Sequence, residues 1–354
     1  MIRILRTGPP VLSLALLLVV LPVIDARYLV VQAGYVLDDL FGARRFAAVT
    51  APTPEEEELF SRVRAVRQFG IAELGLSETR AYTRYKRVER EALVWVVSGV
   101  RELSWERHLW DYPLVGALPY RGYYREPDAA REAERLRASG YDALYRRVTA
   151  FSFLGFLPDP LYSFALERSY ASLADLILHE MTHAALFVRG QGSFNENLAS
   201  FLGTEGARQF IEATYGVGSD EYRQMMTRRE ELAAARALML RLQEELRALY
   251  DRLPADVPRT EARLRKRAVI ERFQADLAEE YDTLFQTDAF RWLTEMELSN
   301  AVVDLYVTYG SDQNRFDELL SNRGGSIPTL LRDIKAIRPA IAEQGIAALE
   351  ALDE

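Results

Sequence analysis

A seven-residue repeat of apolar side chains constrains the fold of the second half of this chain. Apolar residues recur at this spacing, with three more between them: Met225, Leu232, Met239, Leu246 and Leu253, then Ala235, Leu242 and Leu249. The repeat predicts a long helix with one apolar seam, which Pro254 and Pro258 end. A second pattern from Ile270 to Leu284 predicts a return helix, and hence a helical hairpin. Of two interpretations, a solvated structural arm and a partner-binding surface, we favour the arm.

Composition excludes several classes of protein. Of the 354 residues, 49% are hydrophobic and 27% are charged, which is the balance of a globular protein and not of a disordered or multi-span membrane protein. The formal net charge of -8 argues against a nucleic-acid partner. Cysteine is absent, so any metal ion must be held by His, Asp or Glu. Only three histidines are present: His108, His179 and His183.

The N-terminus has the pattern of an export signal. Arg3 and Arg6 precede an apolar run from Val11 to Ile24. This run is shorter than the roughly 20 apolar residues of a membrane span, so residues 1–27 are expected to be a signal peptide or an N-terminal membrane anchor. A buried core helix is the alternative. We therefore expect an exported protein, either periplasmic or anchored in the membrane and facing the periplasm.

The segment from Ser172 to Phe187 contains the sequence HExxH within a stretch that is apolar nearly all round. Such a stretch predicts a buried helix. His179 and His183 lie four residues apart on one face, so both imidazoles can converge on one Zn²⁺ ion. Glu180 would then point beside the metal, where it can act as a general base on bound water. The sequence therefore predicts zinc as the cofactor.

Zinc needs a third protein ligand, and the next segment offers one. We expect Gly190 and Gly192 to end the HExxH helix, and Asn195 to cap a new helix in which Glu196 stands in the first turn. An antiparallel helix after a short turn returns beside the end of its predecessor, so Glu196 can reach the metal.

Other assignments of these residues stay open. Glu205 and Glu212 lie farther along the same predicted helix and are the alternative ligands. Glu196 could instead serve only to stabilise the helix N-terminus through the helix dipole. His108, which lies among aromatic and charged residues in the sequence WERHLW, is expected to be a structural histidine.

The sequence resembles a known family, beginning with the residues HEMTHAALFVRGQGSFNENLASFLGTEG. This signature is similar to that of a bacterial family of predicted aminopeptidases, a gluzincin-like group. Further matching segments are 66–76, 119–124, 151–162 and 298–301, the last followed by Tyr306 and Tyr309. The resemblance covers most of residues 28–340. Many relatives carry a lipobox cysteine at the end of their leader, which this chain lacks.

The resemblance implies a zinc peptidase and roles for its residues. The implied metal ligands are His179, His183 and Glu196, and the implied general base is Glu180. A donor to the developing oxyanion is also needed, and Tyr309 or Tyr306 could supply a phenol, as a tyrosine does in other gluzincins. The expected substrate is a peptide. The segment 120–124 is either an ordinary strand or an edge strand on which that peptide lies.

The expected fold is α+β and mainly α-helical, a zincin-like metallopeptidase core with a long helical hairpin. Predicted helices at 54–74 and 127–138 alternate with predicted strands at 93–97, 114–117, 120–124 and 148–153. The division that follows is a catalytic region at 28–216, the hairpin at 217–290 and a C-terminal helical region at 291–354 that completes the catalytic domain.

The function that these observations favour is a zinc-dependent peptidase, with aminopeptidase activity taken from the family. HExxH does not say where the bond lies in the substrate, so an endopeptidase or another zinc amidohydrolase is the alternative within enzymes. A catalytically silent, zinc-bearing helical scaffold is the alternative from another class. Glu180 argues against that scaffold, because a structural zinc site needs no general base. The oligomeric state does not follow from the sequence.

Overall fold

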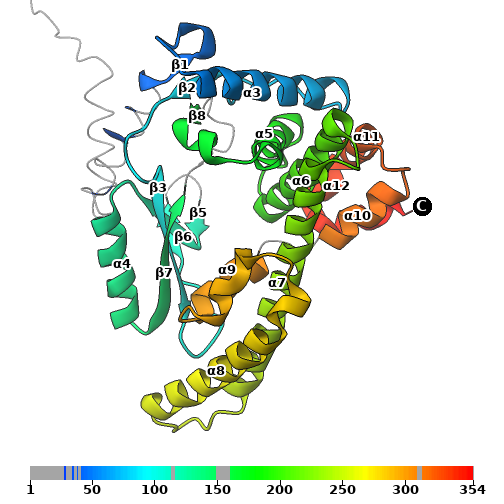
Figure 1. Ribbon diagram of the computed structural model, residues 1–354. Helices are drawn as coiled ribbons and strands as arrows, with labels where there is room; N and C mark the ends of the chain where they lie inside the picture. The colour runs from blue at the N-terminus through cyan, green and yellow to red at the C-terminus, as the bar shows by residue number, and fades with distance from the viewer. Residues whose placement is uncertain are drawn as a thin grey trace, which may run out of the picture.

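Helices make up most of the molecule, and small sheets lie along one side of it (Figure 1). The computed structural model describes residues 28, 34–35, 38, 41–112, 116–148, 160–308 and 313–353. The α-helices of this part are α3 (Pro54–Ala72), α4 (Glu126–Ala138), α5 (Tyr170–Ala185), α6 (Gly192–Tyr215), α7 (Asp220–Asp251), α8 (Arg259–Leu284), α9 (Asn300–Thr308), α10 (Gln313–Ser321), α11 (Ile327–Ala336) and α12 (Arg338–Gln344). An α+β, mainly α-helical fold is thereby confirmed.

The strands form three small sheets. Their bounds are β1 (Arg44–Arg45), β2 (Arg84–Lys86), β3 (Val94–Arg101), β4 (Trp110–Tyr112), β5 (Gly116–Leu118), β6 (Tyr120–Tyr123), β7 (Tyr141–Val148) and β8 (Leu161–Tyr162). The largest sheet is antiparallel, with the order β6-β3-β7. Strand β6 therefore lies at an edge, where the hydroxyl of Tyr28 donates a hydrogen bond of 2.8 Å to the carbonyl oxygen of Gly122.

Strand β7 begins directly after α4 and was not predicted, and the strand predicted at 148–153 lies outside the described residues except for Val148. Gly140 has a positive φ of 85°, and this turn leads the chain from α4 straight into the strand. Ala143 packs with the cluster under α4, whereas Leu144 packs with the cluster of the helical hairpin. Both faces of β7 are thus covered, and its charged residues Asp142, Arg146 and Arg147 hid the strand pattern.

Helix α5 lies within the largest apolar core. Leu173, Ile177, Leu178 and Met181 of α5 are completely or almost completely buried. They pack with side chains of α3, α6, α10 and α11, which surround α5 on the upper and right-hand parts of Figure 1. The apolar character of the HExxH segment is explained by this position.

The predicted hairpin is present as α7 and α8, which lie in the lower part of Figure 1. Apolar residues of the repeat, including Met239, Leu242 and Leu246, are buried against Phe273 and Leu277 of the return helix. Side chains of α9 and of the segment between α8 and α9 belong to the same cluster. The hairpin is therefore no free arm, because α9 and the neighbouring sheet cover part of its apolar face.

Charged and polar groups join the sheet to α8 and α9, and we call this set the sheet–hairpin junction: Glu102, Asp142, Lys266, Asn300, Arg259 and Arg263. The carboxylate of Glu102 accepts hydrogen bonds from Arg259 (2.6 Å) and Arg263 (2.7 Å). Lys266 donates to the Glu102 carbonyl oxygen (2.9 Å) and pairs with Asp142. Asn300 is fully buried, and its amide donates to the carbonyl oxygen of Arg101 (2.8 Å).

Some predictions fall on residues outside the described part of the chain. These are the leader at 1–27, most of the resembling segment at 151–162, and Tyr309. Within the described residues, no helix is both long enough and apolar enough to span a membrane. The domain division, the leader and the cellular location stay predictions.

Candidate metal centre

Helix α5 places His179 and His183 on one face, one turn apart. The helix begins after Ser169, whose hydroxyl accepts a hydrogen bond of 3.2 Å from the backbone N–H of Ser172. The two imidazole rings have their centroids 4.9 Å apart and are nearly perpendicular, at 83°. The predicted helix is confirmed, but it ends at Ala185 and therefore before Gly190, because Leu186 and Val188 enter the core in an irregular segment.

Glycines let neighbouring helices approach α5 closely. A Cβ atom at Gly203 of α6 would lie 2.9 Å from the carbonyl oxygen of Asp175 and 3.1 Å from Cβ of His179. On another side, a Cβ atom at Gly70 of α3 would lie 2.9 Å from Leu178. At Gly70 the nearest atoms are the ends of flexible side chains, whereas at Gly203 a larger residue would meet the backbone of α5. Gly203 therefore sets the distance between α5 and the helix that carries Glu196.

Asn195 braces the segment between α5 and α6. Its side-chain oxygen accepts a hydrogen bond from the N–H of Val188, and its side-chain amide donates to the carbonyl oxygen of Val188, both at 2.8 Å. Helix α6 already begins at Gly192, so the prediction of Asn195 as an N-cap is wrong. The buried Asn195 instead satisfies the N–H of Val188 in the core, while the Val188 carbonyl oxygen also accepts a hydrogen bond from the N–H of Gln191.

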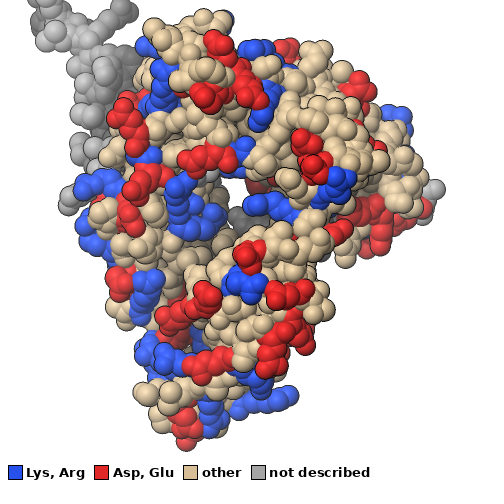
Figure 2. All heavy atoms as spheres, in the orientation of Figure 1, with Lys and Arg blue, Asp and Glu red and all other residues tan. Residues whose placement is uncertain are grey.

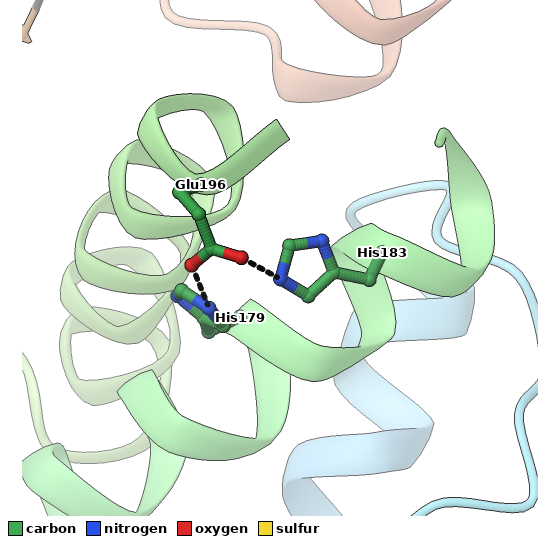
Figure 3. A group of neighbouring side chains, drawn as sticks. All are labelled: His179, His183 and Glu196. Atoms are coloured by element: carbon green, nitrogen blue, oxygen red, sulfur yellow. Dashed lines mark ion pairs between the residues drawn. The ribbon is translucent and has the colours of Figure 1, made fainter. Parts of the chain in front are cut away.

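His179, His183 and Glu196 converge (Figure 3). The Nε2 atoms of His179 and His183 lie 3.7 Å and 3.5 Å from the two carboxylate oxygens of Glu196. One ligand atom from each residue lies within 4.8 Å of the others. The His183 side chain is 4% exposed, that of His179 23% and that of Glu196 42%, so the cluster is open to solvent on the side of Glu196.

Charges around the cluster shift its pKa values in opposite directions. Burial favours a lower pKa for His179, but the carboxylates of Glu196, Glu180 and Asp175 outweigh burial and raise it. Burial lowers the pKa of His183 to about 4, helped by the charge of His179 and opposed by Glu196. Burial favours a higher pKa for Glu196, but the two imidazoles lower it. A neutral His183 and an ionised Glu196 are the forms that bind a metal ion.

The residues of this cluster fit a zinc ion. Two imidazole nitrogens and one carboxylate oxygen are a known ligand set for catalytic zinc, and ligands at 2.0–2.1 Å in tetrahedral geometry lie about 3.3 Å apart. Nδ1 of His183 is buried and has no hydrogen-bond partner in the described part of the chain. The separations of 3.5 Å and 3.7 Å are too long for good hydrogen bonds but suit a shared cation.

Glu180, the predicted general base, lies between the two histidines in sequence and is 8% exposed. Its charge acts on His179, so the carboxylate lies near the cluster. Among the described residues, the close group of possible metal ligands consists of His179, His183 and Glu196, and Glu180 is not part of it. This position agrees with a group that acts beside the metal and does not hold it.

The alternative ligands lie elsewhere. Glu205 is buried and accepts hydrogen bonds from Arg208 (2.7 Å) and Arg229 (3.3 Å). Glu212 also pairs with Arg208, at 2.6 Å. Both carboxylates therefore stabilise contacts of α6 with arginines on α6 and α7, and neither belongs to the cluster around Glu196.

The other predicted residues have mixed outcomes. Tyr306 packs against Trp292 of the hairpin cluster, with ring centroids 5.9 Å apart, and its role in the chemistry stays a prediction, as does that of Tyr309. His108 lies among aromatic rings, 4.4 Å from Trp110 and 5.2 Å from Tyr141 between centroids. It is away from the cluster, as expected for a structural histidine.

Sequence reasoning missed Asp175, which lies one turn before His179 on α5. Thr204 donates a hydrogen bond of 3.2 Å to its carboxylate, and its charge helps to raise the pKa of His179. Carboxylates near metal-binding histidines orient them. The spacing of four residues between Asp175 and His179 was the available signal, because it places both on one helix face.

Comparison with known proteins gives a family and no closer relative. Residues 43–349 match the model of a family described as "Putative aminopeptidase". No curated protein and no solved structure matches the chain. The matched region includes the whole of the cluster and most of the described helices and strands. The chain therefore belongs to the putative aminopeptidase family.

Proposed function

We propose that this protein is a zinc-dependent peptidase of the gluzincin type that releases residues from the amino end of peptides. The observation that carries the proposal is the convergence of His179, His183 and Glu196, with donor atoms within 4.8 Å of one another. Membership of the aminopeptidase family supplies the reaction class. The cluster supplies a place for the metal, and the HExxH sequence supplies a base beside it.

In this proposal three residues bind the metal ion and a fourth transfers the proton. His179, His183 and Glu196 would hold the zinc ion, which when bound supplies a Lewis acid that activates water and polarises a carbonyl group. Glu180 takes a proton onto its carboxylate and returns it to the departing amine. The position of Glu180, buried and next to His179 in the HExxH segment, supports this role.

Two other hypotheses about the function of the site make different predictions. An endopeptidase or another zinc amidohydrolase would use the same residues but would not require a free amine in the substrate. A catalytically silent zinc-bearing scaffold would bind the metal and hydrolyse nothing. We favour the aminopeptidase because the family description names that activity.

A screen of the purified full chain separates these readings. Fluorogenic substrates with a free α-amine are compared with blocked internal peptides, with and without a chelator, and zinc is measured by elemental analysis. We expect about one zinc per chain, and hydrolysis of free-amine substrates that the chelator abolishes. Preference for blocked peptides would indicate the endopeptidase, and zinc without any hydrolysis would indicate the scaffold.

Two substitutions test the roles of single residues. Glu180→Gln keeps the shape of the side chain and should leave zinc content unchanged, while hydrolysis falls roughly 10²- to 10⁴-fold. Glu196→Ala removes a ligand, so zinc content and activity should fall together. Glu212→Gln is the matched control on α6, because its carboxylate pairs only with Arg208 among the described residues. Full activity in Glu180→Gln would overturn the mechanism.

A further inference from the structure

An opening passes beside the start of α5. Figure 2 shows the molecule hollowed between the upper helices and the sheet, with basic side chains on both sides of the hollow. By their places in Figure 1, the elements around it include the connection from η2 (Ser163–Glu167) to α5, the strand β7, and the helices α7 and α9. These elements are far apart in sequence, and the first three each carry an arginine that acts electrostatically on Asp175 or Tyr306.

The three arginines are Arg146 of β7, Arg168 just before α5, and Arg236 of α7. Tyr306 of α9 lies within the electrostatic influence of Arg236 and Arg146. Asp175 of α5 lies within that of Arg168, Arg236 and His179. Arg236 therefore interacts electrostatically with both Asp175 and Tyr306, and Asp175 lies about one helical turn before the predicted metal ligand His179.

Two of these arginines lack a partner among the described residues. Arg168 donates a hydrogen bond of 3.1 Å to Ser172. Neither Arg236 nor Arg146 has a hydrogen bond or an ion pair with any residue of the described part of the chain, although both are only partly exposed. Burial lowers the pKa of Arg236, with Tyr306 and Asp175 acting against that shift. A partly buried guanidinium without a counter-ion is costly, and such a group is well placed to bind an anion.

Asp175 does not fully satisfy Arg236. Its carboxylate accepts a hydrogen bond from Thr204, and no ion pair joins it to Arg236. Burial raises the pKa of Asp175, although His179, Thr204 and the two arginines oppose the shift. Arg236 and Arg146 therefore carry positive charges that no ion pair with a described residue neutralises.

We propose that Arg236, together with Arg146, binds a carboxylate group of the substrate next to the metal centre. The inference rests on the proposed peptidase function and names its substrate class: peptides that carry a carboxylate close to the cleaved bond. Arg236 offers a planar fork of N–H donors that matches a carboxylate in a bidentate manner.

The dimensions fit a short peptide. One helical turn of α5 separates Asp175 from His179, a rise of about 6 Å. An extended peptide spans about 3.3 to 3.6 Å per residue, so a carboxylate near Asp175, on which Arg236 acts, lies roughly two residues from a bond at the metal. That carboxylate is either the C-terminus of a tripeptide-sized substrate or an acidic side chain within it.

Binding of four probes to the full chain distinguishes these sources. The probes are Ala-Ala-Ala as the free acid and as the C-terminal amide, and the amides of Ala-Glu-Ala and Ala-Gln-Ala. Calorimetry uses the zinc-loaded Glu180→Gln protein, so that no probe is cleaved during the measurement. Stronger binding of the free acid over its amide assigns the C-terminus, and stronger binding of the Glu probe over the Gln probe assigns a side chain.

Arg236→Gln in the same background should weaken binding of the preferred carboxylate probe roughly 10- to 100-fold and leave its uncharged counterpart unchanged. Arg236→Lys should keep part of the preference, because a lysine keeps the charge but not the fork. Arg247→Gln is the control, an exposed arginine of the same helix. Circular dichroism checks folding, and Arg146→Gln carries the test if Arg236→Gln does not fold.

Equal binding of charged and uncharged probes would overturn the inference, as would a preference that survives both Arg236→Gln and Arg146→Gln. If the proposed peptidase function is wrong, the experiments give a different result. A protein that prefers the carboxylate probes but, with Glu180 intact, hydrolyses none of them keeps the anion site and loses the peptidase.

Discussion

The helices around α5 and the sheet–hairpin junction are held together in different ways. Around α5, glycines at positions 70 and 203 let helices approach within van der Waals contact of buried apolar side chains. At the junction, contact between the sheet and α8 depends on ionised groups, with Lys266 buried against Asp142 and the carbonyl oxygen of Glu102.

The close packing around α5 and the ion pairs at the junction suit different structural requirements. A metal site tolerates displacements of well under an ångström, and close helix packing gives a stiff environment of that kind. Ion pairs and their hydrogen bonds fix direction and partner choice, but they depend on pH and on salt. We therefore expect the cluster around Glu196 to respond to changes in packing, and the junction to respond to changes in charge.

The largest effect is expected from Gly203→Ala. The added Cβ atom meets the carbonyl oxygen of Asp175 at 2.9 Å, and that backbone cannot move without shifting His179. The free energy of unfolding should fall by about 3 kcal/mol, at the upper end of the usual range for overpacking. Zinc content should fall with it, measured by elemental analysis beside chemical denaturation.

Gly192→Ala is the matched control on the same helix, because no atom lies within 4 Å of the Cβ position at Gly192. It should leave stability and zinc content unchanged. If Gly203→Ala binds zinc as well as the unchanged protein does, close packing does not set the geometry of the site, and the contrast between the two regions disappears.

A smaller effect is expected from Lys266→Met at the junction. The substitution leaves Asp142 and the carbonyl oxygen of Glu102 without their buried donor. The free energy of unfolding should fall by about 2 kcal/mol, the range for a hydrogen bond to a charged group. Zinc content per folded molecule should not change. Lys335→Met, at an exposed lysine of α11, should change neither quantity, and loss of zinc in Lys266→Met would show that the regions are coupled.

The smallest effect is the response of the junction to acid. Burial favours a higher pKa for Glu102, but Arg259 and Arg263 lower it from its ordinary 4.5 to about 2. The folded state therefore holds this proton more weakly than the unfolded state does. The resulting stabilisation is complete above the ordinary pKa and is lost as the pH falls towards 2.

Urea unfolding at pH 5.5 and at pH 2.5 measures this contribution. The unchanged protein should lose on the order of 1 kcal/mol more than Glu102→Gln between the two conditions, since solvent screens the exposed arginines. Glu58→Gln, at an exposed carboxylate of α3, should behave as the unchanged protein does. Identical acid responses of Glu102→Gln and the unchanged protein would remove Glu102 as the origin of the effect.

Local spacing explains which parts could be predicted from the sequence. The i, i+4 spacing fixes His179 and His183 on one face of α5, and a short connection brings Glu196 back beside them. The role of Asn195 could not be predicted in the same way. An asparagine near a helix start has the same sequence pattern whether it caps the helix or braces the preceding segment.

Long-range packing explains why other features could not be predicted from the sequence. Arg146 and Arg236 act electrostatically on Tyr306 because α7 and α9 lie against the sheet, and no repeat or motif in the sequence encodes that placement. Strand β7 was not predicted for a related reason, since Leu144 packs on the hairpin cluster while Ala143 packs under α4. Both features depend on packing against elements that are far away in the sequence.

The three residues of the metal cluster lie close together in the chain, within residues 179–196. A growing polypeptide therefore possesses the whole donor set once residue 196 has been made, whereas Arg236 and Tyr306 follow later in synthesis. Closing so short a loop costs little chain entropy. We expect that capture of the ion can precede completion of the carboxylate-binding hollow, so that the nascent chain acquires its cofactor before it can select a substrate.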